Sequence, residues 1–182
     1  RLHVVSLQSL VGPPQVVEDG RTFEVNALKK ARTLAQFSGL PTLADDSGLE
    51  VDALNGAQGN YSARHSGAEG DDDHNNQKLH YELRNIPESA RTARFVCALA
   101  ICVPAANGVR EWVARESCEG RIASALHGSH GFGYDPLFFY APFGKTFGEI
   151  DRDEKAMVSH RGKALRRLAE ALPSILYPAA KP

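Results

Sequence analysis

Leu43-Ala44-Asp45-Asp46-Ser47-Gly48-Leu49-Glu50-Val51 is the segment to which the other motifs of this sequence can be related. Apolar residues from Leu40 to Ala44 predict a short buried strand that ends at two carboxylates. An apolar/acidic alternation with a period of two follows from Leu49 to Leu54. Carboxylates at the end of a buried strand are costly to desolvate unless they are paired or coordinate a cation.

The two adjacent acids allow two interpretations. Mg²⁺ binds hard oxygen ligands and usually takes one or two carboxylates, while water and substrate phosphates complete its coordination. Taken alone, Asp-Asp-Ser-Gly is more typical of a turn, because Asp and Ser bond their own backbone and Gly allows positive φ. Motifs farther along the chain favour the magnesium site.

The composition indicates a single soluble globular domain over residues 1–182. Hydrophobic residues make up 42% and charged residues 24%, so the chain can bury a core of ordinary size. With 21 basic and 22 acidic residues the formal charge is −1, which argues against nucleic acid or an anionic membrane as the main partner. No apolar run is long enough to span a bilayer, and the first residues do not resemble a signal peptide.

The cysteines, Cys97, Cys102 and Cys118, form no Cys-x-x-Cys pair. An odd number of cysteines without metal-ligand spacing predicts reduced, mostly buried thiols and a cytoplasmic protein. The same spacing argues against a zinc site.

Strand and helix patterns alternate along the chain, which predicts the α/β class. Residues 2–7 predict a first strand, which Gly12-Pro13-Pro14 breaks. Thr22 is a suitable N-cap for a helix over residues 23–38, and Gly39 ends that helix. Asp71, Asp72 and Asp73 are predicted to cap a second helix over residues 72–84, with Leu79 and Leu83 on its buried side. The remaining predicted elements are a central strand over residues 94–103, strands over residues 111–117 and 119–123, a helical stretch that opens at residue 151, and an amphipathic helix ended by Pro173.

Four motifs stand in one order along the chain, and each of them is weak alone. They are Asp45-Asp46-Ser47-Gly48-Leu49, Tyr61-Ser62-Ala63-Arg64, Phe132-Gly133-Tyr134-Asp135-Pro136, and Glu154-Lys155 with Ser159-His160-Arg161-Gly162-Lys163. Together they make the chain resemble the inosine/xanthosine triphosphate pyrophosphatases, enzymes that remove non-canonical purine nucleotides. The helix start at residues 22–27 and the strand at residues 92–95 are also similar, so the resemblance extends from about Glu18 to Leu172.

The resemblance implies an elongated α/β protein with a mixed, twisted sheet, flanking helices and a long cleft between two lobes. It implies Mg²⁺-dependent hydrolysis of a nucleoside triphosphate to the monophosphate and pyrophosphate, usually by a homodimer. The expected substrates are ITP, dITP and XTP.

The resemblance also implies the roles of individual residues. Asp46 matches the general base and metal ligand, and Glu18 matches a further metal-binding acid. Because two adjacent acids can divide this work, we assign Asp45 to the metal or to support of its ligands. The expected substrate contacts are Ser47, Lys30, Phe132, Gly133, Tyr134, Asp135, Lys155, His160 and Arg161.

Hydrolysis between the α and β phosphates brings water onto phosphorus through a field of negative oxygens, so catalysis relies on positioning and charge stabilisation. Asp46 would orient or deprotonate that water. Lys30 and Lys155 would neutralise the charge that builds on the leaving pyrophosphate.

Recognition of the base calls for a flat apolar face and for matched polar groups. Phe132 offers such a face between two glycines, and Arg161 is a planar donor suited to the C6 carbonyl. Asp135, or a backbone carbonyl, would accept a hydrogen bond from N1–H.

Two departures from the family pattern leave alternatives open. The family begins with a strand and a Thr/Ser-Gly-Asn-x-x-Lys phosphate loop, which this chain lacks, so we expect either an upstream segment or weak triphosphate binding. Val25 stands where the family commonly has Glu, which weakens a metal role for that helix turn. The alternatives are an Mg²⁺-dependent hydrolase of another nucleotide or phosphate ester, and a nucleotide-binding remnant without catalysis.

Overall fold

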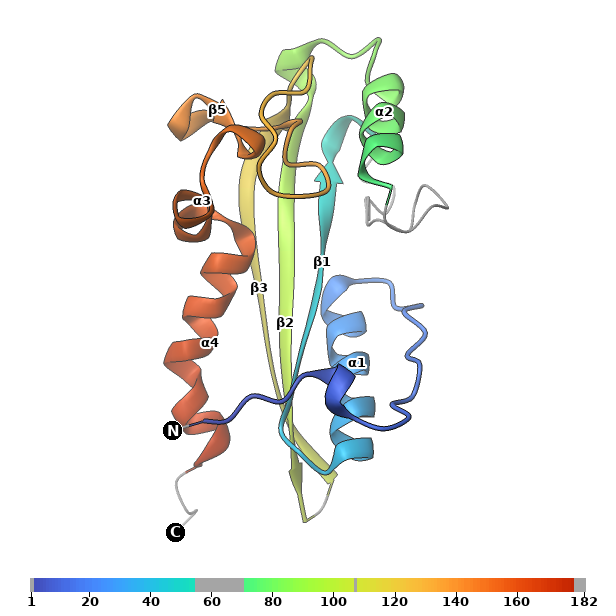
Figure 1. Ribbon diagram of the computed structural model, residues 1–182, viewed down its shortest axis with the longest axis vertical. Helices are drawn as coiled ribbons and strands as arrows, with labels where there is room; N and C mark the ends of the chain where they lie inside the picture. The colour runs from blue at the N-terminus through green and yellow to red at the C-terminus, as the bar shows by residue number, and fades with distance from the viewer. Residues whose placement is uncertain (1, 55–70, 107, 179–182) are drawn as a thin grey trace. The chain divides into compact units, whose positions relative to one another are not determined.

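The computed structural model describes residues 2–54, 71–106 and 108–178. Its helices and strands are α1 (Phe23–Ser38), β1 (Thr42–Val51), α2 (Asp72–Glu82), β2 (Thr92–Ala105), β3 (Gly108–Ile122), β4 (Phe138–Tyr140), β5 (Lys145–Thr146), α3 (Arg152–Val158) and α4 (His160–Leu176). Strands and helices are interleaved, so the predicted α/β class is confirmed (Figure 1). The Tyr61–Arg64 motif lies outside the described residues.

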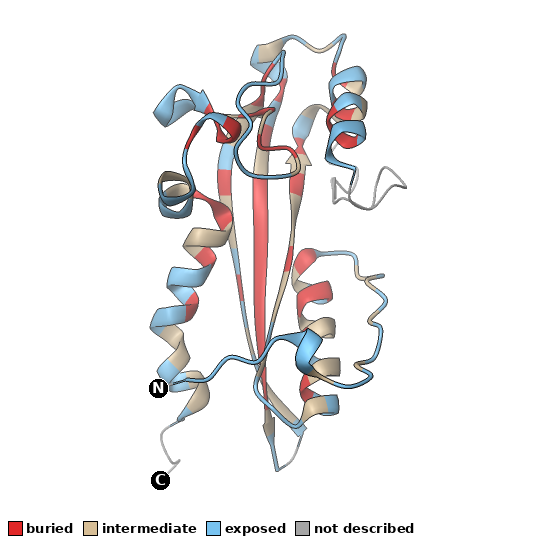
Figure 2. Cartoon of the chain, viewed as in Figure 1, coloured by how far each residue is buried: buried red, intermediate tan, exposed pale blue. Residues whose placement is uncertain are grey.

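The strands form one five-stranded sheet in the order β1-β2-β3-β4-β5. β4 pairs antiparallel with both β3 and β5, with Ile122 opposite Phe138 and Phe139 opposite Thr146. β2 has a neighbour on each side, as its continuously apolar sequence predicted, and it is buried along most of its length (Figure 2).

The chain divides into two compact units. The first comprises Arg1–Asp46, Ala98–Ala114 and Arg167–Pro182, and the second comprises Ser47–Cys97 and Arg115–Arg166. The single domain expected from the chain length stays a prediction.

In the first unit, α1 begins and ends where the sequence predicted. Thr22 Oγ1 accepts a hydrogen bond from the Val25 N–H, which satisfies one of the free donors of the first turn. Gly39 ends the helix in the left-handed conformation, at φ 68°. The buried residues Ala27, Ala31 and Ala35 recur every fourth position, so one stripe of the helix is packed.

The core of the second unit is built around Phe95 of β2. Its ring centroid lies 4.5 Å from that of Phe138 and 5.9 Å from that of Phe147. α2 contributes Leu79 and, just beyond its end, Leu83, both fully buried as predicted. Aromatic packing therefore fixes the segment that follows β3 against the sheet.

Three predictions of secondary structure are wrong. The segment 2–7 forms no strand, because its side chains are exposed and bury no face; Leu2 is 56% and Val4 88% exposed. β1 does not stop at the acids but continues through Asp46 to Val51, so the turn interpretation fails. α4 continues past Pro173 to Leu176, because the Pro173 carbonyl still accepts from the Tyr177 N–H.

The thiols of Cys97, Cys102 and Cys118 are free and buried, as predicted. Burial raises the pKa of the Cys118 thiol to about 11, so it stays protonated at neutral pH. Among the described residues, no helix is long and apolar enough to cross a membrane.

Candidate active site

A lysine and two carboxylates form the polar centre of the first unit. Lys30 on α1 places its Nζ 2.9 Å from Glu18 Oε2 and 3.0 Å from Asp46 Oδ1. The three side chains are 20%, 18% and 11% exposed, so water screens their charges only in part. The structure thus brings together three residues that the sequence placed in one site.

The connector that carries Glu18 is held against α1 by a buried amide. Asn26, 4% exposed, accepts a hydrogen bond from the Gly20 N–H at 2.8 Å through its Oδ1. A Cβ on Gly20 would lie 2.5 Å from that same oxygen, so only glycine fits there. Asn26 was expected only as part of a helix-start motif, and this contact gives it a positioning role.

Asp46 has an unusual environment for an aspartate. Burial is the largest influence on its carboxyl and raises the pKa above the ordinary value. A hydrogen bond with Glu18 acts in the same direction, whereas Lys30 and Asn26 lower the pKa of Asp46 without cancelling the rise. A carboxyl with a raised pKa is a stronger base once ionised, which suits proton abstraction near neutral pH.

Mg²⁺ is compatible with this donor set. Glu18 and Asp46 supply two carboxylates on either side of one lysine, and Mg²⁺ commonly takes one or two carboxylates and keeps its waters. Within the described ranges, no group of three or more His, Cys, Asp or Glu side chains could hold a metal ion. Successive side chains of a strand point to opposite faces, so Asp45 and Asp46 face different sides of β1.

The second unit contains a pocket on which nearly all other predicted substrate contacts converge. It is lined by residues of β1, α2, β2, the segment before β4, α3 and α4: Ser47, Gly48, Leu49, Asp72, Asn75, Phe95, Phe132, Gly133, Tyr134, Asp135, Lys155, His160 and Arg161. Eight of the nine expected substrate contacts, Ser47 among them, therefore belong here, while Lys30 belongs to the first unit.

Phe132 presents an aromatic face at this pocket between two cations. Its side chain is 63% exposed, unlike the buried Phe138. Lys155 Nζ lies 4.7 Å and Arg161 Cζ 5.8 Å from the centroid of the Phe132 ring. Such distances allow cation–π attraction, which orients both cations toward the ring.

Asp135 shapes the loop that carries Phe132. Its carboxylate, 2% exposed, accepts a hydrogen bond from the Phe132 N–H at 2.9 Å and pairs with Lys155. Gly131 has φ 78°, and a Cβ there would lie 1.9 Å from Asp135 Oδ2. We expected this carboxylate to accept a hydrogen bond from the base. In the structure it is bonded to the Phe132 N–H and to Lys155.

Tyr134 and His160 are buried at the wall of the pocket. The His160 ring stacks on Phe95 with 4.9 Å between centroids, and its side chain is 5% exposed. Burial, then the nearby carboxylates of Glu82 and Asp72, raise the pKa of Tyr134 to about 12. Both rings therefore contribute shape, and the phenol stays neutral.

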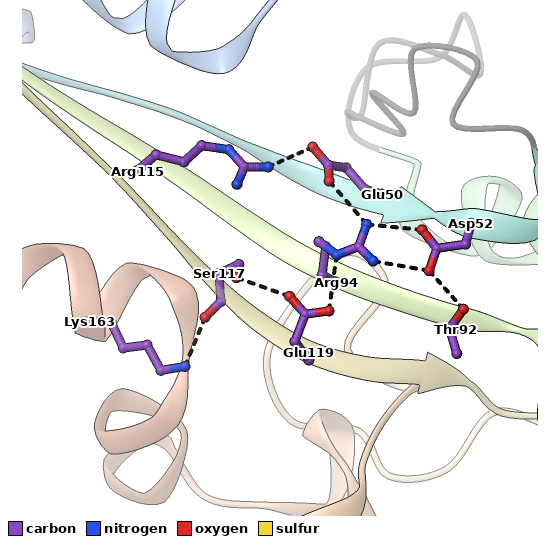
Figure 3. A network of polar contacts seen from close by, with 8 residues as sticks. All are labelled: Glu50, Asp52, Thr92, Arg94, Arg115, Ser117, Glu119 and Lys163. Atoms are coloured by element: carbon purple, nitrogen blue, oxygen red, sulfur yellow. Dashed lines mark hydrogen bonds and ion pairs between the residues drawn. The ribbon is translucent and has the colours of Figure 1, made fainter.

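The Thr92-Ala93-Arg94-Phe95 strand serves the sheet rather than the pocket, apart from Phe95. Arg94 donates to both carboxylate oxygens of Asp52 at 3.0 Å, and also to Glu119 and Glu50 (Figure 3). Glu50 and Glu119 belong to the neighbouring strands β1 and β3, and Asp52 directly follows β1, so the network ties the strands together.

Sequence reasoning missed the contribution of α2. Asp71, Asp72 and Asp73 were all interpreted as caps, but Asp71 alone accepts from a helix N–H, that of His74 at 2.8 Å. Asn75, 3% exposed, lines the pocket, and its buried Oδ1 has no hydrogen-bond partner among the described residues. The only sequence signal for this role of α2 was two adjacent asparagines in a predicted helix, because asparagine is a poor helix former.

Comparison with known proteins agrees with these observations. A sequence model described as the Ham1 family matches residues 1–171. A "dITP/XTP pyrophosphatase" of Desulforamulus reducens is 52% identical over 169 residues, which cover 93% of this chain and 83% of the relative. A protein of the same name from Syntrophobacter fumaroxidans is 52% identical over 166 residues, or 91% of this chain and 69% of the relative.

Solved structures give the same result. The Staphylococcus aureus Ham1 protein superposes with a TM-score of 0.86 at 37% identity, covering 94% of this chain and 87% of that one. A nucleoside-triphosphatase, dITP/XTP pyrophosphatase, from Mycobacterium abscessus superposes with a TM-score of 0.78 at 44% identity, covering 93% and 85%.

Proposed function

This chain belongs to the Ham1 family, and on that premise we propose that it hydrolyses the non-canonical purine nucleotides ITP, dITP and XTP to the monophosphate and pyrophosphate. The observation that carries the proposal is the buried Asp46 with its raised pKa, held beside Glu18 and Lys30.

We propose Mg²⁺ as the cofactor, held by Glu18 and Asp46; Asp45, which we expected to help hold the metal, faces the other side of β1 and has no part in this proposal. When bound, the ion would neutralise phosphate charge and lower the pKa of its water. The carboxylate pair fits this ion because each oxygen is a hard ligand and Lys30 offsets only one of the two negative charges.

The residues of the chain divide the chemistry of hydrolysis. Asp46 accepts a proton from the attacking water, which its raised pKa favours. Lys30 sits against the same carboxylate and donates to the phosphate oxygens as negative charge moves onto the leaving pyrophosphate. Since phosphoryl transfer depends chiefly on such placement, loss of one of these groups reduces the rate without changing the fold.

The pocket supplies selection of the base. Phe132 stacks on the purine, and Arg161, held near that ring, donates to the C6 carbonyl of hypoxanthine or xanthine. Adenine carries an amino group at C6 and would meet Arg161 with an unmatched donor. The homodimer that the resemblance implies and the cytoplasmic location that the cysteines indicated stay predictions.

The experiment that tests the proposal measures products from a panel of nucleotides with and without Mg²⁺. Pyrophosphate from ITP, dITP and XTP, little from ATP, and none after chelation is the expected result. Release of orthophosphate would favour the phosphate-ester hydrolase instead. Binding of ITP without any product would favour the nucleotide-binding remnant.

A further inference from the structure

Both backbone polar groups of Gly133, which belong to the peptide groups on its two sides, are held by α2. The Gly133 N–H donates to Asp72 Oδ2 at 2.6 Å, and the Gly133 carbonyl accepts from Asn76 Nδ2 at 2.8 Å. Gly133 follows Phe132 directly, so this pair of bonds acts on the backbone of the residue that presents the aromatic face.

Asn76 is itself fixed within α2. It is 2% exposed, and its Nδ2 also donates to the Asp72 carbonyl at 2.8 Å. With the amide rotated by half a turn, its oxygen would face two carbonyl oxygens, so the hydrogen-bond pattern determines the orientation of the side chain. The helix therefore offers one acceptor and one donor at a fixed spacing.

The loop is fastened on its other side by Asp135. Its carboxylate accepts from the Phe132 N–H, and its backbone carbonyl accepts from the Gly148 N–H at 2.9 Å. Phe132 thus stands between two backbone anchors, although the residue is 63% exposed and its ring is not packed into the core. A ring in that position keeps its orientation only if the backbone beneath it is held.

We propose that Asp72 and Asn76 are positioning residues that set the base selectivity of the pocket by fixing the backbone at Gly133. This inference rests on the proposed function. Discrimination between a 6-oxo and a 6-amino purine requires Phe132 and the polar groups beside it to keep one arrangement, because a loop that shifts can pair with either base. If Asp72 only stabilised the start of α2, its loss would not change the preference between the two bases.

The test compares Asp72→Ala with Asp73→Ala as its matched control. Both changes remove one carboxylate from the first turn of α2, but Asp73 has no side-chain hydrogen bond or ion pair among the described residues. Pyrophosphate release from ITP and from ATP gives kcat/KM for each, and hydrogen exchange followed by mass spectrometry reports protection of the Gly133 amide.

We expect Asp72→Ala to lower kcat/KM for ITP by about ten- to a hundredfold, the effect of one charge-assisted hydrogen bond, mainly through KM. ATP should lose much less, so the ITP/ATP ratio falls, and exchange at Gly133 becomes faster. Asp73→Ala should leave both the ratio and the exchange unchanged. Asp72→Asn retains an acceptor oxygen and should restore most of the ratio.

Other results would overturn the inference in distinguishable ways. Faster exchange at Gly133 with an unchanged ITP/ATP ratio would show that the contacts hold the loop but do not select the base. An equal fall in the ratio for Asp72→Ala and Asp73→Ala would assign the effect to the helix terminus. Wild-type protein that releases no pyrophosphate from ITP would overturn the proposed function itself.

Discussion

Lys30 is the residue that allows two carboxylates to lie together in the first unit. Without a cation between them, Glu18 and Asp46 would repel each other and one would take up a proton. Lys30 Nζ lies within 3.0 Å of both carboxylates. Lys30 lowers the pKa of Asp46, but the pKa stays above its ordinary value. The pKa of Asp46 therefore reflects burial and the hydrogen bond with Glu18 more than the contact with Lys30.

Arg161 should decide between 6-oxo and 6-amino purines. We expect Arg161→Ala to reduce kcat/KM for ITP far more than for ATP, because the lost donor pairs only with a C6 carbonyl. One buried mismatch costs about 1–3 kcal/mol, so the ITP/ATP ratio should fall by about 5- to 150-fold. Side-by-side pyrophosphate assays measure this.

The matching control for Arg161 is Arg166→Ala on the same helix. Arg166 donates to the backbone carbonyls of Ala156 and Met157 and does not line the pocket. It should leave the ratio unchanged. An equal loss on ITP and ATP in Arg161→Ala would assign Arg161 to the phosphates.

At the scale of elements, the loop before β4 depends on glycine. Gly131 and Gly144 both have positive φ, 78° and 64°, but a Cβ on Gly131 would lie 1.9 Å from Asp135 Oδ2 whereas one on Gly144 meets no atom within 4 Å. Gly144→Ala should cost only the backbone strain of about 1–2 kcal/mol. Gly131→Ala should cost more and raise KM for ITP, as urea unfolding and steady-state kinetics would show. Equal effects of the two changes would mean that the loop is free to move away.

The network on the sheet predicts a pH dependence of stability. Hydrogen bonds from Thr92 and then Arg94 lower the pKa of Asp52 below its ordinary value. A lowered pKa in the folded state gives stability that is present above the unfolded pKa and is lost as pH falls through the folded value. Because Asp52 is 44% exposed, the contribution at neutral pH should be about 1 kcal/mol or less.

Asp52→Asn should therefore lower the free energy of unfolding at pH 7 and approach wild type as the pH falls through the lowered pKa of Asp52. Urea unfolding at several pH values measures the difference. Asp73→Asn is the control, since that carboxylate has no partner among the described residues. If the variant and the wild type differed in free energy of unfolding by the same amount at every pH, the charge of the Asp52 carboxylate would not be the cause.

For the molecule as a whole, the sequence predicted what depends on neighbouring residues. Thr22 and Gly39 bounded α1 correctly, because caps act within one turn. The strand predicted for residues 2–7 does not form, because a strand needs a pairing partner elsewhere in the chain. We predicted that the first strand would stop at the acids, because Asp and Gly are poor strand formers in isolation. Pairing within the sheet overrides that preference, and β1 continues to Val51.

The candidate site was predictable to a similar extent. The motif residues from Phe132 to Arg161 converge on one pocket, as the resemblance implied. The bond between Asp72 and Gly133 joins residues 61 positions apart, so no local pattern could reveal it. Asp135 was predicted to face the base because a carboxylate accepts hydrogen bonds, and its internal partners became visible only in the fold.

The most direct test of the account is pyrophosphate release from ITP by wild type and by Asp46→Asn, each with Mg²⁺ in excess. The substitution keeps the shape of the side chain and removes its negative charge, and circular dichroism would confirm that both proteins are folded. We expect turnover to fall by about 10²–10⁴-fold, the contribution of a positioned general base. A folded Asp46→Asn protein that releases pyrophosphate at nearly the wild-type rate would contradict the role of Asp46.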